Sequence, residues 1–131
     1  MKSSERTLSD SLEVLLRVIP EHKDLQPALI RSTLGIRPAD HFSIDEDRDI
    51  AILEFEPGSD LTVREERIRW QQPKFRTACE WLRERSPASF QTLTNEGLRI
   101  DLYIGQYWGY VPLELLEQVV RLKLHLWFSD G

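Results

Sequence analysis

Residues 98–129 read LRIDLYIGQYWGYVPLELLEQVVRLKLHLWFS and predict a strand, a turn, a helix and a second strand, in that order. In residues 98–104, leucines and isoleucines alternate with Arg99, Asp101 and Tyr103. This period of two is typical of a strand that buries one face. Burial of each such leucine or isoleucine stabilises a fold by roughly 1.5–3 kcal/mol. We therefore expect this unit to anchor the core.

The helix and second strand follow a turn marked by Gly105 and Gly109. Pro112 suits the first turn of a helix, where its missing N–H costs little. The expected apolar stripe of this helix consists of Leu113, Leu115, Leu116, Val119, Val120 and Leu122. In the second strand, Leu122, Leu124, Leu126 and Phe128 alternate with Lys123, His125 and Trp127. If both strands lie in parallel in one sheet, the crossover should be right-handed.

Composition limits the classes of protein to consider. The 131 residues are enough for one domain, 1–131, with a sizeable core. A net charge of −5 disfavours nucleic acid as a partner. We find no apolar run for a membrane span and no signal-peptide pattern. The single cysteine, Cys79, excludes an internal disulfide and fits a cytoplasmic location.

The first half of the chain alternates between polar and apolar segments. Residues 1–10 are polar, and we expect a disordered tail. Residues 12–19 predict a strand ended by Pro20, and Asp24 is a candidate cap for a helix that Gly35 ends. We expect an exposed acidic loop over residues 37–49. A strand is expected over residues 50–55, followed by a turn.

Residues 61–72 allow two interpretations. We favour a returning hairpin strand that ends near Trp70, with Pro73 in the first turn of the next helix. The alternative is one long helix kinked at Pro73. The face of the following helix would carry Phe75, Ala78, Cys79 and Leu82. Ser86 and Pro87 start another helix, which ends near Gly97. Together these elements predict a single-domain α+β fold of about five strands in a mixed sheet with about four helices.

Two motifs stand out in the order of these signals: Leu34-Gly35-Ile36-Arg37-Pro38, and Asp101-Leu102-Tyr103-Ile104-Gly105 followed by Gly109-Tyr110 and a leucine-rich helix. With these motifs the chain resembles a bacterial family, domain of unknown function family 4279. The resemblance covers residues 11–129. This chain departs from the family pattern at Ala39 and over residues 40–72. The resemblance implies an α+β fold with a mixed sheet and no assigned activity. Such proteins can occur beside bacterial toxin genes as immunity factors.

Catalytic and metal motifs are weak. Asp45, Asp47, Asp49 and Glu56 match several ligand positions of a calcium loop, but Ile50 stands where that loop needs glycine. No histidine has a second one at metal-ligand spacing. An enzyme would require His41 or His125 to lie beside a second titratable group in a cleft. We therefore expect no catalytic residue, no metal site, no cofactor and no enzymatic activity.

The polar face of the last two strands is the candidate site. The predicted partner-binding residues are Arg99, Asp101, Tyr103, Tyr107, Trp108, Lys123, His125 and Trp127. Leu15 and Arg17 of the first strand could extend this face. Aromatic and arginine side chains dominate binding energy at protein interfaces. A solvated or partly helix-covered face is the alternative.

These observations favour a non-enzymatic binding protein, most concretely an immunity-type protein that neutralises a bacterial toxin. Its negative charge suits a basic partner. The second hypothesis is a small-molecule-binding or regulatory module with an aromatic pocket near Tyr107 and Trp108. A homo-oligomer is compatible with either hypothesis. We expect neither nucleic acid nor a membrane as partner.

Overall fold

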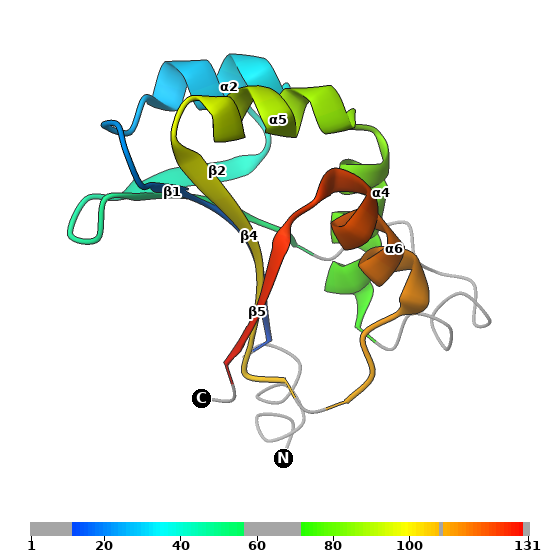
Figure 1. The fold of residues 1–131 in the computed structure, drawn as a ribbon. Helices are drawn as coiled ribbons and strands as arrows, with labels where there is room; N and C mark the ends of the chain where they lie inside the picture. Colours follow the sequence, from blue (N-terminus) through cyan, green and yellow to red (C-terminus); the bar gives the residue numbers. More distant parts are fainter. Residues whose placement is uncertain (1–11, 57–71, 108, 130–131) are drawn as a thin grey trace.

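The computed structural model describes residues 12–56, 72–107 and 109–129. The elements are β1 (Glu13–Pro20), α2 (Pro27–Leu34), β2 (His41–Asp45), β3 (Ile50–Glu54), α4 (Pro73–Arg83), α5 (Pro87–Asn95), β4 (Leu98–Gly105), α6 (Leu113–Leu122) and β5 (His125–Ser129). The strands form one sheet in the order β2-β3-β1-β4-β5 (Figure 1). Among the described strands, only β4 and β5 pair in parallel. The predicted α+β fold, with a five-stranded mixed sheet and four helices in the described residues, is confirmed.

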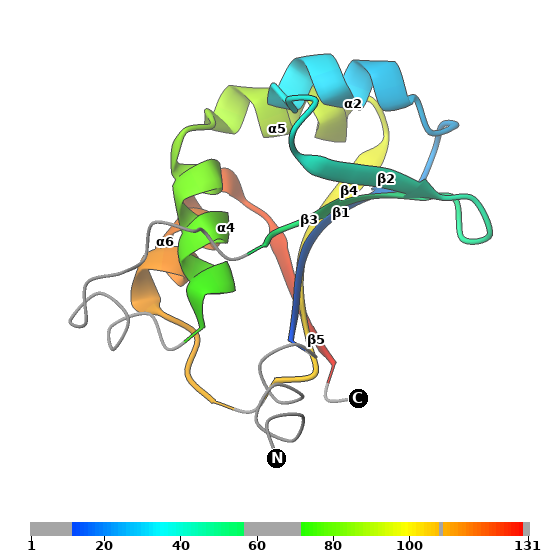
Figure 2. The ribbon, with the colours of Figure 1, turned by 180° about the vertical axis from the view of Figure 1, so that it is seen from behind.

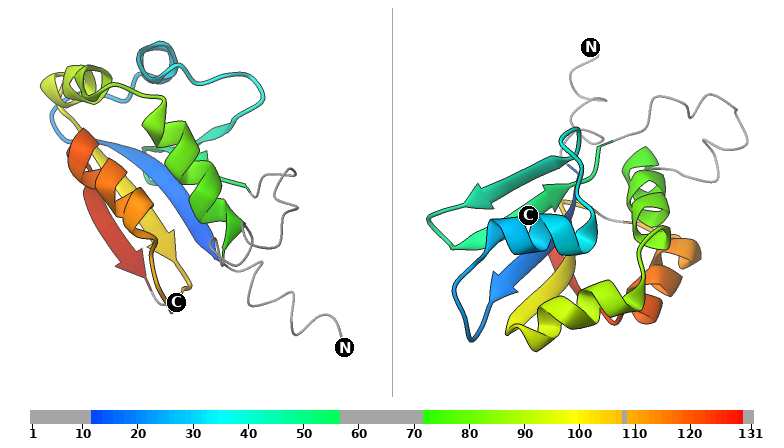
Figure 3. Two further views of the ribbon diagram at one scale, coloured as in Figure 1. Left: turned by 90° about the vertical axis from the view of Figure 1, so that its right-hand side faces the viewer. Right: turned by 90° about the horizontal axis from the view of Figure 1, so that it is seen from above.

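The described helices lie on one face of the sheet, as Figures 2 and 3 show from behind, from the side and from above. Helix α2 packs beside α5, and α4 packs beside α6. The predicted face of α4, with Phe75, Ala78, Cys79 and Leu82, is buried. Among the described residues, no helix has the length and apolar character needed to cross a bilayer.

Strand β1 lies at the centre of the sheet, between β3 and β4. Val14, Leu16 and Val18 alternate along it and are buried under the helices. The residues between them point to the opposite face and are partly exposed. The predicted first strand is thus confirmed, and its central position explains why its apolar face is so regular.

Strands β4 and β5 pair in parallel, the arrangement that the sequence left open, with Leu102 opposite Leu126. The predicted start of the last strand at Leu122 is wrong. Leu122 is the last residue of α6, and Lys123 ends the helix in the left-handed conformation with φ +58°. Leu122 at the end of α6 and Leu124 just before β5 are both buried. Their spacing of two therefore imitates a strand although no single strand contains both.

The predicted apolar stripe of α6 is too wide. Leu115, Val119 and Leu122 are buried, since spacings of four and three residues place them on one side of the helix. Leu113 and Val120 are 68% and 76% exposed. They are seven residues apart and share the outer side. A stripe of six apolar residues covered more of the circumference than the sheet and α4 can bury.

Helix α2 ends at Gly35, as predicted. Gly35 has φ +66°, and the N–H of Ile36 donates to the carbonyl of Arg31 at 3.0 Å. The expected cap at Asp24 is wrong, because α2 begins at Pro27 with Gln26 as its capping residue. Proline fixes the φ angle needed in the first turn, so no side-chain cap is used.

The acidic segment 37–49 is not a loop throughout, because β2 lies within it. Strand β2 pairs antiparallel with β3, and Phe42 lies opposite Leu53. The alternation of Phe42 and Ile44 with polar residues was the signal. The hairpin strand predicted to end near Trp70 and the tail 1–10 lie outside the described residues. Gln72 is extended before α4, which contradicts the alternative of one long helix through Pro73.

Candidate functional site

The sheet face opposite the helices, here called the open face, carries the polar residues of β1, β4 and β5. Arg17 lies opposite Asp101, which lies opposite His125. In the next cross-strand row, Leu15 lies opposite Tyr103, which lies opposite Trp127. In the described part of the chain, no helix covers this face (Figure 3). The alignment of β1, β4 and β5 is as predicted. The prediction that Lys123 is a strand residue of this face is wrong, because Lys123 ends α6 and β5 begins at His125.

An ion network fixes the middle of the open face. A carboxylate oxygen of Asp101 lies 3.2 Å from Arg17 Nη2, and the other accepts a bond from Arg99 Nε at 3.2 Å. Arg99 also lies 3.5 Å from Glu21. Asp101 is only 1% exposed. Although we predicted it as a contact residue, its carboxylate is used within the sheet and orients two arginines that reach solvent.

Aromatic residues surround this network. The guanidinium of Arg17 lies over the Tyr103 ring at 4.4 Å, which leaves Tyr103 half-buried. Gly105 accommodates that ring, because a Cβ there would lie 2.7 Å from it. Trp127 is 56% exposed and Phe128 is 54% exposed, on opposite sides of β5. Sequence alternation assigned Phe128 to the core. The structure leaves it uncovered because β5 is an edge strand.

Tyr107 does not belong to the open face. Its ring packs edge-on against Phe75 of α4, with centroids 5.1 Å apart, and its hydroxyl donates to the carbonyl of Tyr110 at 2.6 Å. Burial raises the pKa of the Tyr107 phenol. Trp108 lies outside the described residues. Neither of the two hollows described below includes Tyr107, so the aromatic pocket proposed around it receives no support from this packing.

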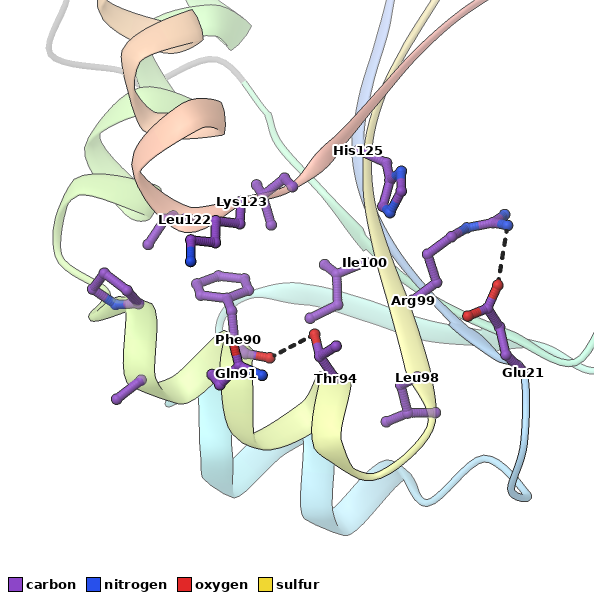
Figure 4. Close-up of a pocket in the computed structure, with 13 residues that line it drawn as sticks. Glu21, Phe90, Gln91, Thr94, Leu98, Arg99, Ile100, Leu122, Lys123 and His125 are labelled. Atoms are coloured by element: carbon purple, nitrogen blue, oxygen red, sulfur yellow. Dashed lines mark hydrogen bonds and ion pairs between the residues drawn. The ribbon is translucent and has the colours of Figure 1, made fainter.

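A pocket of about 350 Å³ lies where β4 and β5 begin (Figure 4). We call it the β4–β5 pocket. Its apolar wall is formed by Phe90, Leu98, Ile100, Leu122 and Leu124. Its polar residues include Arg99, Lys123 and His125, three of the predicted contact residues. Lys123 and His125 are exposed, and no described side chain forms an ion pair or hydrogen bond with either. No sequence pattern indicated that they would share a pocket with α5.

A second hollow, of about 640 Å³, lies between β3 and α4 and is called the acidic groove. Its carboxylates are Asp40, Glu54, Glu56, Glu80 and Glu84. Partial burial and the nearby Glu56 carboxylate raise the pKa of Glu54. Trp81 and Phe55 form part of its wall, with ring centroids 5.8 Å apart. Composition gave only the net negative charge of the chain, whereas the structure shows carboxylates gathered in this groove.

Each of the two hollows contains a histidine. His41 lines the acidic groove with Asp40, and His125 lines the β4–β5 pocket with Lys123, so both lie beside titratable groups. Neither imidazole forms a hydrogen bond with another described residue. Among those residues no group of three or more histidines, cysteines or carboxylates is arranged to hold a metal ion. Cys79 is buried, and burial raises its thiol pKa, which disfavours the reactive thiolate.

Comparisons with known proteins leave the family open. No family model, curated protein or solved structure matches the chain. The resemblance to domain of unknown function family 4279 therefore remains a prediction. The functional argument rests on the open face, the β4–β5 pocket and the acidic groove.

Proposed function

We propose that this protein is a non-enzymatic binding protein that docks a protein partner along β5. The observation that carries this proposal is the edge position of β5 together with Trp127 and Phe128, which are exposed on its two sides. An edge strand offers unpaired backbone groups to an extended segment of another chain. Exposed aromatic side chains on both sides can then hold that segment.

The sequence of β5 supports this use. Edge strands are commonly protected by charged residues or proline, which prevent unwanted pairing. Residues 125–129 are HLWFS and contain no lysine, arginine, carboxylate or proline. The strand is also held firmly from its inner side, because five consecutive positions pair with β4. A rigid edge without protective charges is expected where a partner binds.

The most concrete form of the proposal is an immunity-type protein in the cytoplasm that occludes a bacterial toxin. The resemblance in the sequence motifs supports it. The acidic groove lies at β3, and β1 and β4 separate β3 from β5. A basic partner docked on β5 would reach the acidic groove only if it were large. Near β5 lie the partly buried Arg99 and the exposed Lys123 and His125, whose side chains are cationic or titratable. A basic toxin would therefore use β5 through aromatic and backbone contacts.

The test is co-expression with the product of the neighbouring gene. We expect the two proteins to co-purify and the binding protein to restore growth if the neighbour is toxic. Trp127→Ala should weaken the complex at least tenfold, about 1.4 kcal/mol, because an exposed tryptophan at an interface contributes at this level. Isothermal titration with the purified pair measures this loss.

Val120→Ala is the matched control, since Val120 is exposed on α6 away from β5. It should leave affinity unchanged. Equal loss in both variants, or none in Trp127→Ala, would contradict docking along β5. A dimer of this chain in light scattering that Trp127→Ala dissociates would assign the edge to a second copy instead of a toxin.

A further inference from the structure

The β4–β5 pocket exists because β4 starts before β5 does. Pairing between the two strands begins with Asp101 opposite His125. Residues 98–100 of β4 pair only with β1 on their other side. Their edge toward β5 therefore carries no strand, and the chain between α6 and β5 passes around the space. Helix α5 closes the space from below (Figure 4).

The walls of this pocket differ sharply in polarity. Phe90 of α5, with Leu98 and Ile100 of β4, forms an apolar floor, and Leu122 and Leu124 close one side. The hydroxyl of Thr94 donates a hydrogen bond to the carbonyl of Phe90 at 3.0 Å. Such a combination of an apolar wall with a few polar groups is typical of small-ligand sites, and about 350 Å³ is within their usual size.

Cationic side chains lie at the opening. Figure 4 shows Lys123 on the α6 side, His125 at the start of β5, and Arg99 reaching toward Glu21. Glu21 is the only carboxylate among the described lining residues, and Arg99 Nη1 holds it at 3.5 Å. Lys123 has no such partner among the described residues. The opening is thus locally positive in a chain whose net charge is −5.

The backbone of Lys123 sets where its side chain lies. Lys123 ends α6 with φ +58° and ψ +45°, a position that favours glycine. Helix α2 uses Gly35 at the equivalent position. A non-glycine residue held in this region stores strain, and such strain tends to occur at functional sites. Asp49 and Gln106 adopt the same φ away from this pocket, so the conformation alone does not mark a site. At Lys123 it turns the chain from α6 into β5 and leaves the lysine side chain lining the pocket.

We propose that the β4–β5 pocket binds a small organic acid, with its apolar body on Phe90 and Ile100 and its carboxylate at Lys123 and His125. The unpaired backbone edge of residues 98–100 adds hydrogen-bonding groups within the same space. This inference is independent of docking along β5, because Trp127 and Phe128 do not line the pocket.

The experiment compares octanoate with octanol, which share one alkyl chain and differ in charge. Titration of the isotope-labelled protein, followed by NMR, should show octanoate binding about tenfold more tightly than octanol, since only the acid meets the cations. Amide shifts should be confined to residues 87–94 of α5 and to residues 98–100 and 122–125, which line the pocket. Lys123→Met should remove most of the octanoate advantage and leave octanol binding unchanged.

Two variants separate the proposal from a structural role of Lys123. Lys123→Gly should lose the octanoate advantage while its melting temperature stays equal or rises, because the backbone strain is relieved. Arg48→Met removes one positive charge at the exposed β2–β3 turn and should not affect binding. The proposal is overturned if octanoate at about 10 mM shows no binding, because this concentration would reveal even a very weak affinity. Equal binding of acid and alcohol, or shifts located elsewhere, would also overturn it. Loss of partner binding in Trp127→Ala with octanoate binding intact would separate the two sites.

Discussion

The Asp101 carboxylate and the Arg17 guanidinium lie 3.2 Å apart across β4 and β1, with Asp101 almost completely buried. Two bonds from arginines satisfy this carboxylate on a sheet face that no described helix covers. The pair links β1, the central strand of the sheet, to β4, which pairs with the edge strand β5.

Removal of the Asp101 carboxylate should destabilise the fold. Asp101→Ala leaves Arg17 half-buried beside Tyr103 with no acceptor, and hydrogen bonds to charged groups contribute about 1.5–3 kcal/mol. We expect the free energy of unfolding in urea to fall by about 2 kcal/mol. The double variant Arg17→Leu/Asp101→Leu should recover part of this loss, because no charge is then left unpaired. A loss below about 0.5 kcal/mol in Asp101→Ala, the range of ordinary surface changes, would show that the network is not structural.

The two tryptophans of the described chain should respond differently to truncation. Trp81 is buried against Phe55 and beneath Arg85, whose guanidinium lies 3.8 Å from the ring centroid. Trp81→Ala should cost about 3–5 kcal/mol. Trp127→Ala should cost less than about 1 kcal/mol, since more than half of the side chain is already in water. Thermal unfolding followed by circular dichroism measures both. Unfolding of Trp127→Ala would place Trp127 in the core and refute docking along β5.

The left-handed ends of α2 and α6 predict opposite effects of glycine. Gly35 has φ +66° and open space around its Cβ position, so Gly35→Ala should lose about 1 kcal/mol through backbone strain alone. Lys123→Gly relieves the same kind of strain and should gain up to about 1 kcal/mol. Chemical denaturation of both variants tests this. A destabilised Lys123→Gly would mean that the lysine stem packs in the fold, which would weaken the argument for the pocket.

Glu54 predicts a specific pH dependence. Partial burial and Glu56 raise its pKa above the ordinary value of 4.5, so the fold favours the protonated carboxyl group. The resulting stability is fully present below pH 4.5 and is lost as the pH rises through the raised pKa. Glu54→Gln should therefore melt slightly higher than the parent at pH 7 but not at acidic pH. Glu117→Gln, which removes a charge from the exposed side of α6, is the control. A larger benefit of Glu54→Gln at acidic pH would reverse the assigned sign.

Cys79 should be chemically inert in the native state. The thiol is buried, its pKa is raised by burial, and Arg83 Nη2 lies 3.4 Å from the sulfur. We expect no reaction with a disulfide reagent in native buffer and complete reaction in denaturant. Arg48→Cys in a Cys79→Ala background should react at once, because position 48 is exposed. Rapid native labelling of Cys79 would indicate local opening of α4.

The amino-acid sequence was sufficient to predict the elements in which hydrophobic periodicity agrees with the glycine or proline residues at the element ends. The alternation in β1 and β4, the glycine end of α2 and the proline starts of α4 and α5 were all predicted, and each depends on local backbone preferences. Strand β2 was missed because its two apolar residues lie among charged neighbours. It pairs with the next strand, with Phe42 opposite Leu53 and Ile44 opposite Ala51, so the missed signal was its short apolar alternation and not a distant partner.

By itself, the sequence determined the α+β class and which strand residues share a face, because alternation along a strand is a local property. Only the tertiary structure decided which of those residues remain available. Asp101 is buried because arginines from β1 and β4 converge on it, and Phe128 is exposed because no described strand lies on the outer side of β5. The pocket at Lys123 likewise depends on where α6 ends relative to β4. Such exposure is set by contacts between distant segments, which no local pattern encodes.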